Sequence, residues 1–201
     1  MSITLFDPPI RAYVSSARKR FGIGAERIRL SAIPSPAALD TSSLERRVPS
    51  EPNVLVLCYG NICRSPLGER YLRSVATERG MDRVSVASAG LRADEGQPSP
   101  DDAVRAASEF GVDLSEHRSK PATEELVRWS DAVLLMDVYN YRHFRQDFGD
   151  QADKAFFLGA FADGEYEIID PHGDDLAKYR AVYDDVVRSV DGFVTALETD
   201  R

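Results

Sequence analysis

The sequence predicts an α/β protein in which an open, doubly wound parallel sheet of about four strands carries helices on both faces. Short, continuous apolar runs recur from residue 53 onward, which is typical of strands buried on both faces of a parallel sheet. Stretches with helical signals separate these runs, and the chain closes with a long stretch whose apolar residues recur every three or four positions. The 201 residues suit one domain of ordinary size with an appendage.

The first strand and the first helix of this domain have the clearest boundaries. Residues 54–57 read Val-Leu-Val-Leu and predict a buried strand. A helix is predicted over residues 67–79, because Pro66 suits a first helical turn and Gly80 suits the position just past the last one. The loop between them begins at Cys58, at the carboxyl end of a strand, where ligands of such sheets bind.

The later elements alternate in the same way. Further strands and helices are predicted at residues 84–87 (strand), 101–110 (helix), 123–129 (helix), 132–136 (strand) and 155–158 (strand). The last helix carries one apolar stripe that runs from Leu176 to Leu197.

Residues 1–52 differ in composition from the rest, so we predict an N-terminal extension followed by a domain at residues 53–201. One or two short helices are expected between residues 10 and 30, and residues 33–52 contain four prolines and several serines, a linker-like composition. The extension carries eight Lys or Arg and five Asp or Glu, which makes its net charge +3 against −11 for the remainder. We expect a tail that packs on the domain or extends from it, with a docking or membrane-surface role as the alternative.

Composition and charge limit the partners and the compartment. A net charge of −8 argues against general nucleic-acid binding, which requires a basic surface. No apolar run approaches the roughly 20 residues that cross a bilayer, and the first ten residues lack the apolar stretch of a secretion signal. We therefore expect no stable membrane insertion. The only cysteines, Cys58 and Cys63, fit a reducing compartment and hence the cytoplasm, and nothing in the pattern predicts an oligomeric state.

The segment from Cys58 to Ser65, which reads Cys-Tyr-Gly-Asn-Ile-Cys-Arg-Ser, combines the residues that a phosphate-binding loop needs. A tight loop between a strand and a helix directs several backbone N–H groups into one hollow, with the positive end of the helix dipole behind them. Arg64 can hold two phosphate oxygens with its planar guanidinium. The same donors, and the hydroxyl of Ser65, favour the thiolate of Cys58 beneath the phosphorus. Gly60 and Asn61 tolerate the left-handed backbone that such a loop requires.

This segment, continued by Pro66, resembles the signature of the low-molecular-weight protein tyrosine phosphatase family. The resemblance continues in the family's order through Ser-Ala-Gly at 88–90, Asp-Leu-Ser-Glu-His-Arg at 113–118, Met-Asp at 136–137 and Asp-Pro at 170–171. A bare Cys-x5-Arg is a weak signal, but this loop followed by Asp-Pro more than a hundred residues later is specific. The resemblance covers residues 53–198 and implies a flavodoxin-like phosphatase that needs no cofactor or metal ion.

The resemblance also assigns the chemistry. Cys58 attacks phosphorus and forms a phosphocysteine while Asp170 protonates the departing oxygen, and water then attacks with Asp170 as the base. Arg64 and the loop amides stabilise the equatorial oxygens of the transition state. The implied substrate is a phosphorylated protein, with phosphotyrosine first, or a small phosphoester. The residues expected to bind it are Tyr59, Gly60, Asn61, Ile62, Cys63, Ser65 and His172.

Several residues are expected to support the loop rather than react. The resemblance implies that Asn61 and Ser88 hydrogen-bond to hold the strained turn, and that Cys63 can trap Cys58 as a reversible disulfide. Simple packing is the alternative for Cys63. His117 is interpreted as a hydrogen-bonding structural residue. The side chains of Asp137 and Arg118 are interpreted as scaffold.

The sequence departs from the family where phosphotyrosine-specific members flank the pocket with aromatic residues. The corresponding positions are Asp94, or its neighbours in residues 92–95, and His172. Tyr59 stands where the family usually has a smaller residue and is a candidate replacement ring. Phosphoarginine phosphatases of the family tend to have threonine at the position of Ile62, which argues against that substrate.

Three other functions are weighed against a phosphatase. An arsenate reductase shares the scaffold and the loop, but it generally uses an additional cysteine beyond the loop, and this chain has only Cys58 and Cys63. A phosphate-recognition module would bind phosphorylated partners without turnover, although the set of catalytic residues is intact. A zinc site would need both cysteines and two of the three histidines, and the histidines lack paired-ligand spacing.

Overall fold

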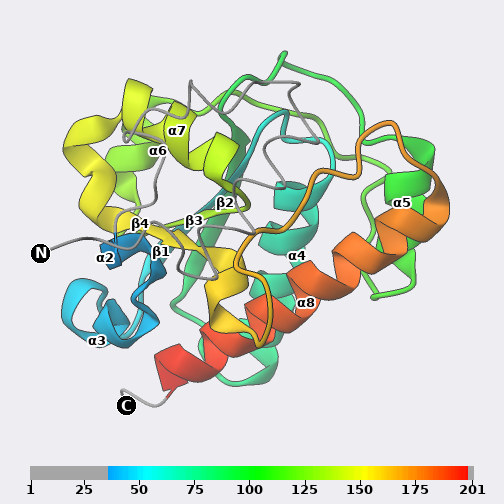
Figure 1. The fold of residues 1–201 in the computed structure, drawn as a ribbon. Coiled ribbons are helices and arrows are strands. Elements are labelled where there is room, and N and C mark those ends of the chain that lie inside the picture. Colours follow the sequence, from blue (N-terminus) through cyan, green and yellow to red (C-terminus); the bar gives the residue numbers. More distant parts are fainter. Residues whose placement is uncertain (1–35, 199–201) are drawn as a thin grey trace, which may run out of the picture. The chain divides into compact units, whose positions relative to one another are not determined.

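The computed structural model describes residues 36–198, which contain a four-stranded sheet flanked by helices (Figure 1). The strands are all parallel and are β1 (Asn53–Cys58), β2 (Ser85–Gly90), β3 (Ala132–Leu135) and β4 (Ala155–Phe157). Their order in the sheet is β2-β1-β3-β4, so the order reverses at β1. This topology confirms the predicted doubly wound fold, and it places the end of β1 at the switch point where such folds bind ligands.

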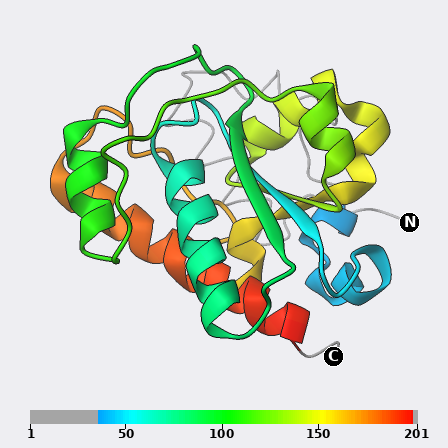
Figure 2. The ribbon, with the colours of Figure 1, turned by 180° about the vertical axis from the view of Figure 1, so that it is seen from behind.

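The helices lie on both faces of the sheet (Figures 1 and 2). On one face α4 (Arg64–Glu78), α5 (Asp101–Ser108) and α8 (Leu176–Glu198) pack together. The other face is associated with α6 (Glu124–Trp129) and α7 (Val138–Asp147), and α7 is followed by the 3₁₀ turn η4 (Gly149–Lys154). The 3₁₀ turn η5 (Leu158–Phe161) packs against α8. Short parallel strands joined by helical crossovers require this two-sided cover, because both faces of the sheet are apolar.

The core follows the alternation of side chains along β1. Val54, Val56 and Cys58 belong to the apolar cluster shared with α4 and α8. Leu55 and Leu57 are equally buried but point to the opposite face, as the period of two in a strand requires. The strand is therefore rigid from both sides, and its last residue is held in place beneath the loop that follows.

Helix α7 is the one α-helix of residues 53–198 that the sequence analysis missed. Its N-cap is Asp137, whose side chain accepts a hydrogen bond from the backbone N–H of Asn140 at 2.7 Å. Its buried apolar side chains, Val138, Tyr141 and Phe144, recur every three residues, but polar residues between them mask the stripe. The sequence features that could have predicted α7 are an acidic N-cap residue and the apolar residues that follow it at three-residue intervals.

Residues 36–48, which composition assigned to a linker, are folded and packed. They form α2 (Pro36–Leu39), the 3₁₀ turn η3 (Thr41–Ser43) and α3 (Leu44–Arg47), with Leu44 and Val48 buried. The guanidinium of Arg47 lies 4.0 Å above the ring of Phe156 and donates to the carbonyl oxygen of Ala155. The segment therefore covers β4, the edge strand, and protects its exposed backbone groups.

The domain boundary at residue 53 stays a prediction. The structure describes residues 36–198 as part of one compact unit, residues 34–201. The helices predicted between residues 10 and 30 lie outside the described residues.

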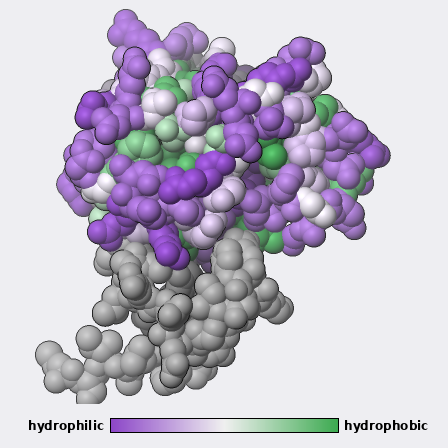
Figure 3. Space-filling model, turned by 90° about the horizontal axis from the view of Figure 1, so that it is seen from above, coloured by the Kyte–Doolittle hydropathy of each residue, from purple (hydrophilic) through white to green (hydrophobic). Residues whose placement is uncertain are grey.

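The face of the molecule that Figure 3 shows is largely hydrophilic. One face of the molecule shows mostly polar and charged side chains, with apolar side chains in small scattered patches (Figure 3). Within residues 36–198, no helix combines the length and the apolar character needed to cross a membrane.

Candidate active site

The sulfur of Cys58 lies at the carboxyl end of β1, inside a tight loop that leads into α4. The hydroxyl oxygen of Ser65 is 3.0 Å from the sulfur, and the backbone N–H of Asn61 donates to it at 3.2 Å. The sulfur therefore has a backbone amide and a hydroxyl within hydrogen-bonding distance. The predicted nucleophile is thus placed among donors, at the N-terminal end of a helix of fifteen residues.

Asn61 fixes the shape of the loop. It is the only described non-glycine residue with a positive φ, at 52°. Its amide nitrogen donates to the hydroxyls of Ser65 and Ser88, each at 3.0 Å, and its amide oxygen accepts from the backbone N–H of Lys120. The implied bond between Asn61 and Ser88 is therefore present. Of the two residues expected to tolerate a left-handed backbone, Asn61 adopts it and Gly60 does not.

Strand β2 approaches the loop closely from the side. Its last residue, Gly90, pairs with Cys58 across the sheet. A Cβ atom at Gly90 would lie 2.9 Å from the backbone nitrogen of Asn61, so only glycine leaves room for the loop at this point.

His117 supports the loop from outside. Its Nε2 atom is 2.7 Å from the carbonyl oxygen of Asn61. Burial lowers the pKa of His117, so the imidazole is neutral near pH 7 and donates from Nε2 to that carbonyl. The structure thus gives His117 the hydrogen-bonding position expected of a structural residue.

Arg64 is almost fully buried and is held by two carboxylates. Its Nη1 atom donates to Asp137 Oδ2 at 2.7 Å and to the carbonyl oxygen of Ile168, and its Nη2 atom lies 2.6 Å from Asp170 Oδ2. Burial alone would lower the pKa of Arg64, but the charges of Asp137 and Asp170 raise it above its ordinary value. Asp137 is therefore more than scaffold for α7, because it also orients the guanidinium.

One donor of this guanidinium is left over. The Nε atom of Arg64 is buried and has no hydrogen-bond partner among the described residues. Burying an N–H group without a partner is costly, and buried groups of this kind in native proteins mark strain or a ligand site. Nε and Nη2 form one edge of the guanidinium, and this edge fits two oxygens of a phosphate group.

Asp170 reaches the loop from 106 residues further along the chain. Its Oδ1 atom accepts a hydrogen bond from the backbone N–H of His172 at 3.2 Å, a turn stabilised across Pro171. The Asp170 side chain is 36% exposed, so water or a leaving group can reach it. His172 and Asp94, at the positions of the family's aromatic walls, are both exposed.

Tyr59 belongs to an aromatic cluster that the sequence analysis did not foresee. We define the aromatic cluster as Tyr59, Tyr139 and His143, with ring centroids 4.5 to 5.8 Å apart. The ring of Tyr59 is 37% exposed, next to the nucleophile in the chain. Tyr139 and His143 lie on α7. Because the sequence analysis did not predict this helix, it predicted neither residue as part of the site.

Cys63 is buried behind the loop. Its sulfur is 3.6 Å from the hydroxyl of Tyr179, and burial raises the pKa of its thiol to about 12. Both cysteines are free thiols. Cys63 is therefore uncharged near pH 7, and its proposed redox role stays a prediction alongside simple packing. Within the described part of the chain, no group of three or more His, Cys, Asp or Glu side chains could hold a metal ion.

Comparison with known proteins identifies the family of the chain. The family model described as "Low molecular weight phosphotyrosine protein phosphatase" matches residues 53–201. The low molecular weight protein-tyrosine-phosphatase Wzb of Escherichia coli K12 is 32% identical over 149 residues, which is 74% of this chain and 97% of Wzb. The protein-arginine-phosphatase of Bacillus subtilis is 32% identical over 150 residues, which is 74% of this chain and 99% of that protein.

A solved structure extends the comparison to three dimensions. The YwlE arginine phosphatase, as a cysteine-to-serine mutant with a phosphorylated active-site serine, superposes with a TM-score of 0.69 at 31% identity. The match covers 74% of this chain and 97% of the YwlE chain. In that relative the phosphoryl group is attached to the residue that replaced a cysteine.

Proposed function

Because the chain belongs to the low molecular weight phosphotyrosine protein phosphatase family and is a cysteine-dependent phosphatase, we propose that it hydrolyses phosphotyrosine in proteins with Cys58 as the nucleophile. One observation carries the assignment to these residues. The buried Nε donor of Arg64 has no partner among the described residues, and it belongs to the loop that holds the sulfur of Cys58. A phosphate group satisfies that donor and also lies above the nucleophile.

The proposed reaction has two steps. The sulfur of Cys58 attacks phosphorus in line, the bond to the leaving oxygen breaks, and Asp170 gives that oxygen a proton. Water then attacks the phosphocysteine, Asp170 takes a proton from the water, and the Cys58 thiolate leaves with inorganic phosphate as the product. Ser65, 3.0 Å from the sulfur, stabilises the thiolate as it departs.

The transition state is stabilised by groups that are already in place. The loop amides and the Nε–Nη2 edge of Arg64 bind the equatorial oxygens, where negative charge is concentrated. Asp137 and the carbonyl of Ile168 fix the other arm of the guanidinium, so little reorganisation is needed. Preorganised donors in the loop therefore bind the phosphate and stabilise the transition state. The overall electrostatic field of the protein does not attract phosphate, because the net charge of the chain is −8.

The aromatic cluster supports an aryl substrate. Other members of the family line the substrate pocket with aromatic residues that follow Ser-Ala-Gly and Asp-Pro, and the corresponding residues in this chain are Asp94 and His172. Tyr59, next to the nucleophile in the chain, has a partly exposed ring. Tyr139 and His143 hold that ring in position from behind. Ring stacking against a phosphotyrosyl side chain contributes about 1 kcal/mol beyond the area it buries.

Two rival activities have less support. A phosphoarginine substrate is suggested by the names of two relatives, but Ile62 gives the pocket an apolar, half-buried side chain where those enzymes tend to have threonine. Arsenate reduction generally requires an additional cysteine, and this chain has only Cys58 and Cys63. We also propose a cytoplasmic location, supported by the two free thiols.

Comparing substrates tests the proposal. Wild-type protein should hydrolyse a phosphotyrosyl peptide faster than a phosphoarginyl peptide or a sugar phosphate, and Cys58→Ser should hydrolyse none of them. Asp170→Ala should slow poor leaving groups by about 10²–10⁴ and an activated aryl phosphate much less. If the rate of hydrolysis fell by the same factor for both kinds of substrate, Asp170 would not be the general acid.

The aromatic wall has its own test. Tyr59→Ala should raise KM for an aryl phosphate about fivefold and leave KM for an alkyl phosphate unchanged, because about 1 kcal/mol of stacking is lost. Trp129→Ala is the matched control, since its ring is also 37% exposed but lies on α6. Equal effects of Tyr59→Ala on both substrates would contradict the stacking role.

A further inference from the structure

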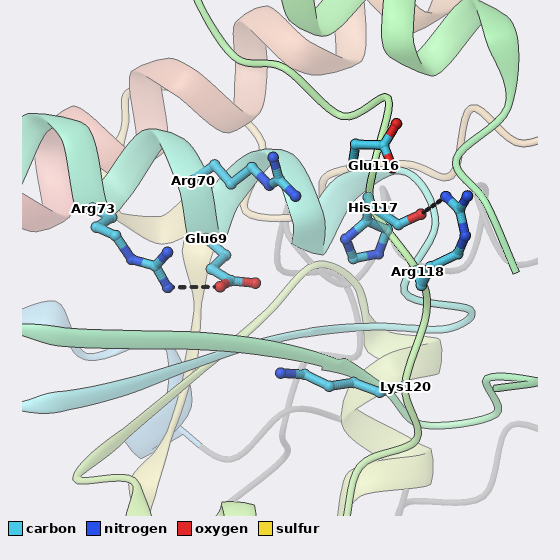
Figure 4. A pocket seen from close by; sticks show the side chains of 7 residues that line it. All are labelled: Glu69, Arg70, Arg73, Glu116, His117, Arg118 and Lys120. Carbon is cyan, nitrogen blue, oxygen red and sulfur yellow. Dashed lines mark hydrogen bonds and ion pairs between the residues drawn. The ribbon is translucent and has the colours of Figure 1, made fainter. Parts of the chain in front are cut away.

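A second hollow lies between α4 and the segment that follows Ser115, outside the loop of the nucleophile (Figure 4). Its volume is about 460 Å³. The residues that line it are Glu69, Arg70, Arg73, Glu116, His117, Arg118 and Lys120. Four of the seven are cationic and two are acidic, in a chain whose net charge is −8. The hollow is thus a local exception to the charge of the molecule.

The two carboxylates offset only part of this charge. Glu69 is already engaged, because it pairs with Arg73 at 2.8 Å and accepts the hydroxyl of Ser88 at 2.5 Å. Arg70 and Arg118 donate only to backbone carbonyl oxygens. Among residues 36–198, no carboxylate lies within ion-pair distance of Arg70, Arg118 or Lys120.

Arg70, Arg118 and Lys120 share the hollow with the carboxylate of Glu116, which leaves an excess of positive charge. Cations that line one hollow repel each other, and a shared anion removes that repulsion. The residues come from two separate segments, α4 and residues 116–120, and line the same hollow (Figure 4). The excess of positive charge suits an anion that carries at least two negative charges. The lining offers no phenyl or indole ring on which a nucleotide base could stack.

The hollow is connected to the catalytic loop by two hydrogen-bonded routes. His117, in its wall, bonds to the carbonyl oxygen of Asn61 at 2.7 Å. Glu69 accepts from Ser88, whose hydroxyl in turn receives the side-chain amide of Asn61 at 3.0 Å. Both routes end at the residue that makes the left-handed turn beneath the nucleophile.

We propose that the hollow formed by Arg70, Arg118 and Lys120 is a second anion site that binds an oligophosphate, free or as the phosphate chain of a nucleotide. An occupant lies against His117 and favours the protonated imidazole, which strengthens its hydrogen bond to Asn61. Binding in this hollow therefore alters the catalytic loop without entering it.

Calorimetry with inorganic tripolyphosphate tests the site. Wild-type protein is first saturated with orthovanadate, which occupies the catalytic loop, and tripolyphosphate should then bind with a 1:1 stoichiometry. Arg118→Gln and Arg70→Gln should each weaken this binding at least fivefold. Arg83→Gln removes the same charge from another exposed position and should leave it unchanged.

The outcomes separate the ligands and the sites. Equal binding of ATP and tripolyphosphate shows that only the phosphate chain is recognised, and tenfold tighter binding of ATP identifies a nucleotide as the source of the phosphates. No binding to vanadate-loaded protein, or equal losses in Arg118→Gln and Arg83→Gln, overturns the proposal.

Steady-state kinetics test the connection to the loop. At saturating aryl phosphate, tripolyphosphate should change kcat at least twofold in wild-type protein and not in Arg118→Gln. An increase in KM alone, equal in both proteins, would show competition at the catalytic loop and would refute the second site.

Discussion

Removing the charge of Asp170 should tighten the binding of inorganic phosphate while it slows catalysis. In the free protein Asp170 Oδ2 lies 2.6 Å from Arg64 Nη2, on the edge of the guanidinium that we assign to phosphate. An incoming phosphate therefore has to displace a carboxylate from the same donor. Asp170→Asn and Asp170→Ala both abolish this competition, although neither can act as an acid.

The size of the effect follows from the geometry of the pair. Two unit charges about 4 Å apart attract by about 4 kcal/mol at an effective dielectric constant of about 20. The Asp170 side chain is 36% exposed, and a displaced carboxylate regains its hydration, so a net cost of about 1 kcal/mol is appropriate. This corresponds to about fivefold tighter binding of phosphate in the variants.

Isothermal titration with orthophosphate at one fixed pH measures the change. Asp174→Asn is the matched control, because it removes the same charge from an exposed position four residues away and should leave the dissociation constant unchanged. If only Asp170→Asn binds more tightly, the gain comes from a new amide hydrogen bond. If neither variant binds more tightly, Asp170 does not compete for Arg64 and the reasoning fails.

Three further predictions concern packing, pH and thiol reactivity. Gly192→Ala should lower the free energy of unfolding by about 1–3 kcal/mol in chemical denaturation, because its Cβ would overlap the carbonyl oxygen of Phe161; an unchanged midpoint would contradict this close contact. Burial lowers the pKa of His117 below 6.5, its ordinary value in the unfolded chain. The neutral His117 side chain therefore contributes fully to stability above pH 6.5, and this contribution is lost as the pH falls from 6.5 through the lowered pKa. His117→Gln should flatten the pH dependence of the melting temperature below pH 6.5. Iodoacetamide at pH 8 should alkylate one cysteine of the native protein, Cys58, and no cysteine of Cys58→Ser. Cys63 is buried and its pKa is raised to about 12, so its thiol stays protonated and unreactive. Alkylation of Cys58→Ser would show that the Cys63 thiol is accessible.

The fold was predictable where local signals and tertiary structure agree. The run at residues 54–57 and the boundaries at Pro66 and Gly80 marked β1 and α4, because burial on both faces and helix termini leave direct traces in sequence. Helix α7 and the helices of residues 36–47 were missed for the opposite reason. Their apolar residues are few and are buried only because the sheet edge and face are nearby.

The site was predictable as a set of residue types but not as a network. The loop motif identified Cys58, Arg64 and Ser65, and Asp-Pro identified Asp170, because the chemistry restricts those residues strongly. The contact of Arg64 with Asp137 spans 73 residues, and no local pattern encodes it. The cluster around Tyr59 likewise depends on a helix whose position is set by packing.

The two arms of Arg64 explain how an acidic chain admits a dianion. Asp137, 2% exposed, holds Nη1 and remains in place because it also caps α7, so the buried guanidinium always has one counterion. Asp170 holds Nη2 from the solvent side and is the partner that a phosphate can replace. In the proposed mechanism, the displacement that seats the substrate is also the movement that frees the Asp170 carboxyl group for the leaving oxygen. Substrate binding and positioning of the acid are therefore one event, controlled by a single guanidinium edge.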